Sequence, residues 1–296
     1  AFYTVLLAAE VKAMLQSNMT NAEDNFKNAS ILAASGLISE YDKLRAEVGL
    51  ANLRPEVIRA ESNYELATNG LKSALGIPFQ QEIEIVGAME FEPVDEGIVQ
   101  QATTTVVESN PSLAALRYQQ DVNDAITAVE RSSYMPSLTV FGNLQYQTQK
   151  NDLRISTRDF VSSSLVGLSL SMNVFNGFRT NARVEQAELD TRKTEEQIAH
   201  TEMNLRTAVK SFALTLKRSR EQIEAQQKTV GQAEKGYRIA STRFASGSGT
   251  QLEVNDAQLA LTTARTNRIQ AIYDYLVASA ELDQLLGRRP AYVSAR

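Results

Sequence analysis

The sequence predicts a mainly α-helical fold made of long antiparallel coiled-coil helical hairpins in two repeats, with one β-hairpin inserted between them. Three observations support this prediction. The stretch ASGLISEYDKLRAEVGLANLR at 34–54 aligns without a gap with ASGSGTQLEVNDAQLALTTAR at 245–265, at an offset of 211 residues. A seven-residue apolar period runs through the proline-free segment 178–245, and a two-residue period follows Pro136.

The internal repeat extends over roughly residues 1–76 and 212–287. Tyr64 returns as Tyr275, Gly76 returns as Gly287, and Phe26 is replaced by the similar Tyr237. A match of this length indicates two copies of one structural unit. Because residues 111–211 precede only the second copy, we expect an N-terminally truncated fragment that lacks about 100 residues.

Each copy is predicted to be a helical hairpin, over 1–76 and over 178–287. At 1.5 Å per residue, the segment 178–245 makes a helix about 100 Å long, which no ordinary globular core can enclose. Its apolar positions repeat in coiled-coil fashion, at Leu205, Val209, Phe212, Leu216, Ile223, Val230, Ala233, Tyr237, Ala240 and Phe244.

Each hairpin turns at a repeated Ser-Gly. Gly36 and Gly247 follow the first helix of each pair, where a glycine adopts positive φ as a C-terminal cap. Ser39 and Thr250 are placed to cap the returning helix. The sequence therefore predicts two capped turns of the same kind.

The segment 77–110 is predicted to be mixed. Pro78, Pro93 and the alternating EIEIVGAMEF indicate a short strand and loops, and a short helix is expected over 95–108. A further helix over 111–136 opens with Asn110 as its cap and Pro111 in its first turn, and it stops before Pro136.

Two strands are predicted within 137–177, at 137–147 and 164–175, joined by a polar loop over roughly 148–161. One face of each strand is apolar and the other is small or hydroxylic, which is typical of a transmembrane β-barrel strand. A hairpin packed on a soluble core is the alternative, but the long helices offer no evident core. The lipid-facing residues expected on the second strand are Leu168, Leu170, Met172 and Val174.

Composition excludes several classes of function. The net charge of −5 argues against nucleic-acid binding, and the absence of cysteine excludes disulfides and thiol chemistry. His200 has no evident metal-binding partners, Glu195 and Glu196 point in different directions on a helix, and GSG at 247–249 lacks the lysine of a phosphate loop. We therefore expect no catalytic, cofactor or metal site and no enzymatic activity.

Taken in order, the motifs resemble those of the TolC family of outer-membrane efflux and secretion channels. LSLSMNVFNGFRT, containing Phe175, Asn176 and Gly177, is similar to the family's strand-to-helix junction, although Phe178 replaces a glycine often found there. NPSL and SSYMPSLTVFGNLQY resemble the family's helix and second-repeat strand. RFASGSGTQLEVNDAQLAL and ASGLISEYDKLRAE resemble its two periplasmic hairpin tips.

The resemblance implies a homotrimeric exit duct of a tripartite efflux or type I secretion system in the outer membrane of a Gram-negative bacterium, with most of the chain in the periplasm. The trimer would share a β-barrel embedded in lipid and an α-barrel below it. Residues 77–110 and the C-terminal tail 288–296 would form an equatorial belt. The implied partners are a periplasmic adaptor and an inner-membrane transporter. The alternative is a structural coiled-coil adaptor or scaffold without a pore, which needs no lipid-facing band.

The resemblance also suggests two functional regions. Adaptor contacts would fall on the tips, at Gly36, Leu37, Ile38, Ser39, Gly247, Ser248, Gly249 and Thr250. A periplasmic gate would use Glu253 and Asp256, with Asp42 on the first hairpin, because three-fold symmetry would bring their carboxylates together as cation-attracting rings. The alternative for these acids is an ordinary exposed helix start.

Overall fold

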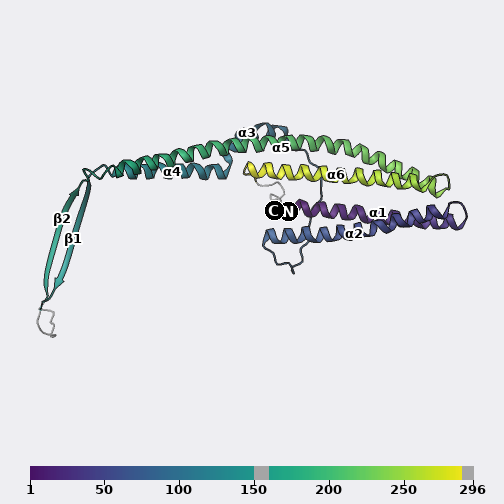
Figure 1. The fold of residues 1–296 in the computed structure, drawn as a ribbon, viewed down its shortest axis with the longest axis horizontal. Helices are drawn as coiled ribbons and strands as arrows, with labels where there is room; N and C mark the ends of the chain where they lie inside the picture. The colour runs from purple at the N-terminus through teal and green to yellow at the C-terminus, as the bar shows by residue number, and fades with distance from the viewer. Residues whose placement is uncertain (150–159, 289–296) are drawn as a thin grey trace. The chain divides into compact units, whose positions relative to one another are not determined.

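The computed structural model describes residues 1–149 and 160–288, and within them it confirms the mainly helical prediction (Figure 1). The residues 289–296 of the expected tail and most of the 148–161 loop lie outside this range. The elements are α1 (Phe2–Ala34), α2 (Glu40–Leu75), α3 (Glu96–Ser109), α4 (Pro111–Ser132), β1 (Ser137–Gln147), β2 (Val161–Ser171), α5 (Arg179–Ala245) and α6 (Gln251–Leu285).

The chain divides into two compact units. The first contains residues 1–109 and the chain from Leu205 onward, and the second contains Asn110–Asn204. Helix α5, which is 67 residues long, contributes its beginning to the second unit and the remainder to the first. The uninterrupted helix predicted over 178–245 is therefore confirmed.

Helix α2 contains a proline in its interior. The helix begins after the Ser39 cap, ends at Gly76 with φ 68°, and continues through Pro55. Proline removes one backbone hydrogen bond and disfavours a helix interior by about 3 kcal/mol. The helix persists because Val57, Ala60 and Leu71 beyond Pro55 are buried in the hairpin.

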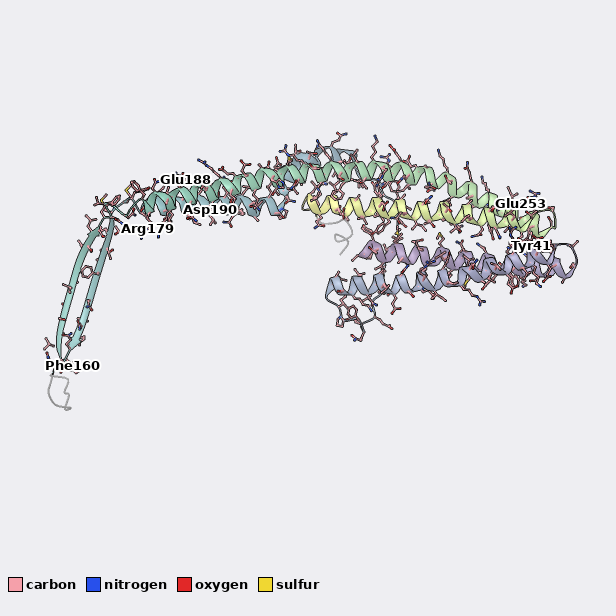
Figure 2. All side chains as sticks on the ribbon, in the orientation of Figure 1. Tyr41, Phe160, Arg179, Glu188, Asp190 and Glu253 are labelled. Atoms are coloured by element: carbon pink, nitrogen blue, oxygen red, sulfur yellow. The ribbon has the colours of Figure 1, made fainter. Side chains whose placement is uncertain are left out.

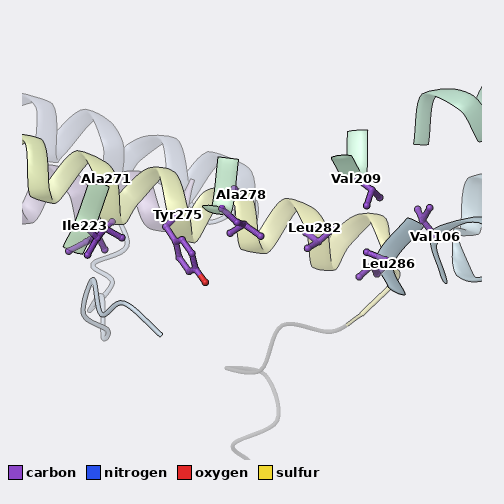
Figure 3. Packing of buried hydrophobic residues seen from close by; sticks show 11 residues of the cluster. Val106, Val209, Ile223, Ala271, Tyr275, Ala278, Leu282 and Leu286 are labelled. Carbon is purple, nitrogen blue, oxygen red and sulfur yellow. The ribbon is translucent and has the colours of Figure 1, made fainter. Parts of the chain in front are cut away.

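The larger core of the first unit joins α3, α5 and α6 (Figure 3). The coiled-coil stripe predicted on α5 contributes Val209, Leu216 and Ile223 to it. Tyr275 is buried at its centre, where its ring meets Phe91 edge-on at 4.8 Å between centroids. The buried members are Ala102, Val106, Val209, Leu216, Ile223, Ala271, Ile272, Tyr275, Ala278, Leu282 and Leu286.

The short strand predicted within 77–95 is wrong, because these residues are irregular in the structure. The described residues of the first unit contain no strand, so an extended segment there has no ladder to join. The segment instead packs Met89, Phe91 and Val94 on the helical core. The backbone N–H of Val94 donates to the hydroxyl of Tyr275 at 2.7 Å.

In the second unit, α4 starts as the sequence predicted. The Asn110 side chain accepts hydrogen bonds from the N–H groups of Ser112 and Leu113, and Pro111 occupies the first turn. Polar side chains then connect α4 to the first part of α5. Arg131 pairs with Glu188 at 2.6 Å, and Asn123 donates to Thr194 at 2.8 Å.

Candidate functional site

The β-hairpin has two chemically different faces. Strands β1 and β2 pair antiparallel from Ser137 opposite Ser171 to Gln147 opposite Val161, and residues directly opposite share a face. The apolar face pairs Leu138 with Leu170, Val140 with Leu168 and Gly142 with Val166. The other face pairs Thr139 with Ser169 and Gln145 with Ser163. The alternation read from the sequence is therefore present in three dimensions.

The apolar face is exposed throughout. Leu168 is 73% exposed, and Leu138, Val140 and Leu170 are similar. Exposed apolar area costs about 25 cal/mol per Å² in water, so a contiguous band of this kind indicates a non-aqueous surrounding or a partner.

The predicted second strand was wrong at both ends, because β2 spans Val161–Ser171 rather than 164–175. Strand β1 begins at Ser137, which pairs with Ser171, so the chain beyond that residue has no partner strand. Leu168 and Leu170 lie in the strand as expected. Met172 and Val174 are exposed but follow its end.

On the polar face, one aromatic ring covers a glycine. Phe141 lies opposite Gly167, and a Cβ added at Gly167 would come within 2.6 Å of the Phe141 ring. Only glycine admits the ring in this position, so the pair shields the backbone of β2 where it has no side chain.

The junction between β2 and α5 contains a strained residue. Phe178 has φ 63°, and it is the one non-glycine residue with positive φ among the described residues. Its ring meets Phe175 at 5.8 Å, and Asn176 donates to the Thr180 hydroxyl at 2.6 Å. The glycine that Phe178 replaces would adopt this conformation without strain.

The two hairpin tips have the capped turns that the sequence predicted. Gly36 and Gly247 both have φ 74°. Ser39 accepts a hydrogen bond from the N–H of Asp42 at 3.1 Å, and Thr250 accepts one from the N–H of Glu253 at 3.2 Å. These caps fix where α2 and α6 begin.

The second tip is held by Arg243, which the sequence analysis did not identify. Its guanidinium donates to the carbonyl of Ser248 at 3.1 Å and lies 3.5 Å from a carboxylate oxygen of Glu253. Its own carbonyl accepts from the N–H groups of Ser248 and Gly249. The repeat contained a signal, because the residue equivalent to Arg243 in the first copy is the apolar Leu32.

The three predicted gate acids have different surroundings. Glu253 lies near the start of α6 (Figure 2). Glu253 and Asp256 are both exposed, and Glu253 pairs with Arg243. Asp42 is half-buried and accepts a hydrogen bond from the Ser39 hydroxyl at 2.7 Å. Glu253 and Asp256 are thus accessible to other molecules, whereas Asp42 is used within its own turn. The rings require further copies of the chain and stay a prediction.

Near the tips, residues from both hairpins form a second buried cluster. Its buried members are Ala29, Ala46, Ala240, Phe244 and Val254, and Phe26, Leu32, Ile38 and Tyr237 pack against it. Burial, and secondly the charge of Asp24, raise the pKa of the Tyr237 hydroxyl. The phenol is therefore held in its neutral form.

The described residues contain no group of three or more histidine, cysteine, aspartate or glutamate side chains that could hold a metal ion. His200 instead contacts the Asn204 side chain at 3.1 Å. In the same part of the chain, no helix has the length and apolar character needed to cross a membrane.

The profile of the outer membrane efflux protein family matches residues 104–288. The chain is 25% identical over 291 residues to the cobalt-zinc-cadmium resistance protein CzcC of Cupriavidus metallidurans, covering 97% of this chain and 66% of the relative. It is 25% identical to outer membrane protein TolC of Vibrio cholerae, covering 86% of this chain and 61% of the relative. It thus spans less than two thirds of each.

Solved structures have the same fold at lower identity. The outer membrane protein VceC of Vibrio cholerae superposes with a TM-score of 0.81 at 15% identity, covering 97% of this chain and 68% of VceC. CusC gives a TM-score of 0.81 at 16% identity over 97% of this chain and 66% of its own length. The helical hairpins and the inserted β-hairpin therefore occur together in these two solved structures as well.

Proposed function

Because the chain belongs to the outer membrane efflux protein family, we propose that it forms part of a passive exit duct that carries cargo across the periplasm and the outer membrane. The relatives and structural neighbours named above are outer-membrane and resistance proteins rather than enzymes, which agrees with the expectation that this chain is not an enzyme. A duct needs no catalytic residues, because the coupled transporter supplies the energy.

The observation that carries the proposal is the two-faced β-hairpin attached to long helical hairpins. Its apolar face, with Leu138, Val140, Leu168 and Leu170, suits lipid. The opposite face suits a water-filled lumen, because serine, threonine, asparagine and glutamine there outnumber the apolar Phe141, Val161 and Leu165. A coiled-coil adaptor or scaffold, the alternative function, has no use for such a band.

In this proposal the chain works as a homotrimer in the outer membrane, with its helical hairpins in the periplasm. The tips at 36–39 and 247–250 contact a periplasmic adaptor and an inner-membrane transporter. Exposed Leu37 supports this role, because its apolar side chain lies in the turn with 65% of the residue surface accessible. The partner-binding surface of the second tip is polar instead.

Glu253 and Asp256 form the gate in this proposal. Their exposure near the start of α6 leaves them available to face the axis of a trimer. The ion pair with Arg243 neutralises part of the Glu253 charge, so Asp256 carries the larger share of the field. Carboxylate rings of this kind concentrate cations and repel anions.

A pair of matched variants tests the channel function. Leu168→Arg with Leu170→Arg places charge on the apolar face, which costs about 2–4 kcal/mol for each arginine at the bilayer midplane. We expect much less protein in the outer-membrane fraction of a Gram-negative host. Ser163→Arg with Ser169→Arg, on the opposite face, serves as the control and is expected to be retained. An unaltered protein found in the soluble fraction contradicts the channel function.

The gate is tested separately in the assembled channel. Glu253→Gln with Asp256→Asn removes both charges and keeps the side-chain shapes. We expect the reversal potential in a salt gradient to move toward zero and block by multivalent cations to weaken. Unchanged values would reduce these acids to an exposed helix start.

A further inference from the structure

One arginine connects the second hairpin turn to an acid of the predicted gate. Nη2 of Arg243 donates to the carbonyl of Ser248 at 3.1 Å, and Nη1 lies 3.5 Å from Oε2 of Glu253. The backbone carbonyl of Arg243 also accepts from the N–H groups of Ser248 and Gly249, at 2.9 and 3.0 Å. Because a guanidinium presents several donors in a rigid fork, one side chain contacts the turn and the carboxylate together.

The carboxylate of Glu253 lies back against its own turn. A Cβ added at Gly249 would come within 3.1 Å of Oε2 of Glu253, so the absence of a side chain at Gly249 leaves the space that the carboxylate approaches. At the offset of 211 residues, Arg243 and Gly249 correspond to Leu32 and Ile38 in the first copy. The first turn therefore offers its acid neither this cation nor this open position.

The second acid of the predicted gate has a different electrostatic surrounding. Asp256 is exposed one helical turn after Glu253, and among the described residues no basic side chain pairs with it. The carboxylate of Glu253, in contrast, faces a guanidinium. The two acids therefore contribute differently to the electrostatic field near the start of α6.

We propose that Arg243 determines the ion selectivity of the gate by cancelling the charge of Glu253. Each chain then supplies one uncompensated carboxylate, that of Asp256, and a second whose charge depends on the contact with Arg243. Arg243 acts through Glu253 and is a positioning residue, because it holds the carboxylate against the turn. The inference rests on the proposed function, which places Glu253 and Asp256 at the gate.

The contact between Arg243 and Glu253 is open to competition from other molecules. The two side chains are 53% and 43% exposed, and exposed ion pairs are weak and screened by salt. The same guanidinium bonds the Ser248 carbonyl, which belongs to the predicted adaptor-contact tip. A partner that displaces Arg243 when it docks on this turn therefore raises the negative charge at the gate and favours cations.

Variants of the two residues should act in opposite directions. Removing the charge of Arg243 leaves Glu253 uncompensated, which adds one negative charge per chain. Removing the charge of Glu253 leaves Arg243 uncompensated, which adds one positive charge per chain. The two effects should cancel when both charges are removed. Damage to the turn alone would not give opposite effects that cancel.

The test is the reversal potential of the assembled channel in a planar bilayer under a potassium chloride gradient. Arg243→Gln should raise the cation-to-anion permeability ratio by at least about twofold, because each chain adds one charge to the field at the gate. Glu253→Gln should lower the ratio, and the double variant should return to the parent value. Arg243→Lys retains the charge and should stay close to the parent.

The matched control is Arg238→Gln, which removes an exposed arginine five residues earlier on α5. Arg238 has no ion pair with Glu253 among the described residues, so its removal should change the ratio by much less than Arg243→Gln does. A parent-like ratio in Arg243→Gln overturns the inference, and so does a double variant that remains far from the parent.

A charge-swapped variant decides the question if Arg243→Gln does not assemble. Arg243→Glu with Glu253→Arg retains the ion pair, so the permeability ratio should stay near the parent value. If Glu253 acts independently of Arg243, the swap places a cation at the gate and lowers the ratio strongly, which overturns the inference.

Asp256→Asn separates a failure of this inference from a failure of the gate. If Asp256→Asn lowers the permeability ratio while Arg243→Gln leaves it unchanged, the role of Arg243 is wrong and the gate of the proposed function survives. If neither variant changes the ratio, the gate itself is contradicted together with the inference.

Discussion

The two hairpin turns have the same backbone and different supports. Gly36 and Gly247 have the same φ of 74°, and the N–H groups three residues after the last helical residue bond back in the same way, Leu37 to Leu32 and Ser248 to Arg243. A short motif of serine, glycine and a hydroxylic cap therefore determines the path of the chain in both copies.

The side chains that hold this path differ between the copies. In the first turn, Leu32 and Ile38 pack on the buried cluster near the tips. In the second, Arg243 replaces Leu32 and Gly249 replaces Ile38, and the guanidinium bonds the Ser248 carbonyl and Glu253. One turn thus relies on apolar burial and the other on charge. The glycine and the capping residue thus determine the backbone path of the turn. The side chains that pack around it differ between the two copies, so the two tips have different surfaces.

The largest expected effect comes from placing the isoleucine of the first turn in the second. A Cβ at Gly249 would lie 3.0 Å from the Cβ of Arg243 and 3.1 Å from the backbone nitrogen of Phe244. Gly249→Ile should therefore lower the free energy of unfolding by about 1–3 kcal/mol in urea titrations. Arg243→Leu with Gly249→Ile should cost less than the sum of the single changes, because the first turn tolerates this pair. If the double variant loses as much stability as the two single variants together, the two positions do not act as a pair.

The glycine with positive φ is common to both turns, so replacing it should destabilise both hairpins equally. Gly36→Ala and Gly247→Ala each place a side chain at positive φ, with an expected cost of about 1–2 kcal/mol. Gly49→Ala, in the interior of α2 where nothing obstructs a Cβ, is the matched control and should stabilise by up to about 1 kcal/mol. A cost at only one of the two turns would show that their backbones are not equivalent in solution.

A smaller effect should distinguish the ion pair of Arg243 from the apolar packing of Leu32, because only the stability due to the ion pair depends on salt concentration. Arg243→Met removes an exposed ion pair, which contributes up to about 1 kcal/mol at low ionic strength and less at high. Leu32→Ala in the first turn should lower the free energy of unfolding by the same amount at low and at high ionic strength. Unfolding in low and high sodium chloride measures the difference, and a salt-independent Arg243→Met would assign its effect to packing instead.

The smallest effect concerns alkaline pH and Tyr237, which replaces Phe26 of the first copy. Burial raises the Tyr237 pKa in the folded chain. Its contribution to stability is complete below the unfolded tyrosine value of about 10 and is lost as pH rises through the folded pKa. Tyr237→Phe should flatten the alkaline fall of the melting temperature. Identical curves for the two proteins above pH ~10 would exclude this residue as the cause.

The sequence was sufficient wherever a structure depends on nearby residues. The caps at Ser39, Asn110 and Thr250, the positive φ of Gly36 and Gly247, and the faces of the β-hairpin were all predicted correctly. The predictions failed where a strand depends on a second strand distant in the sequence. The alternating residues within 77–95 had no strand to pair with, and β2 ends where β1 begins.

Side-chain contacts across a turn could not be predicted from the sequence either. The pairing of Arg243 with Glu253 joins residues on two helices, and only the folded turn brings them to 3.5 Å. The same holds for Pro55, whose place inside α2 depends on burial further along the helix. Glu253 and Asp256 lie near the start of α6 as expected, and their role as a gate stays a prediction. The sequence did not reveal Arg243 as the partner of Glu253.

The ungapped offset between the two copies restricts how the protein can change in length. Both turns belong to hairpins whose equivalent residues stay 211 positions apart from Gln16 to Gly76. An insertion in one hairpin alone would move its tip relative to the other and shift every contact between Met14, Asn18 and their partners on α6. Insertions and deletions are therefore tolerable only as matched pairs of whole heptads in both copies, so that the two hairpins keep the same length.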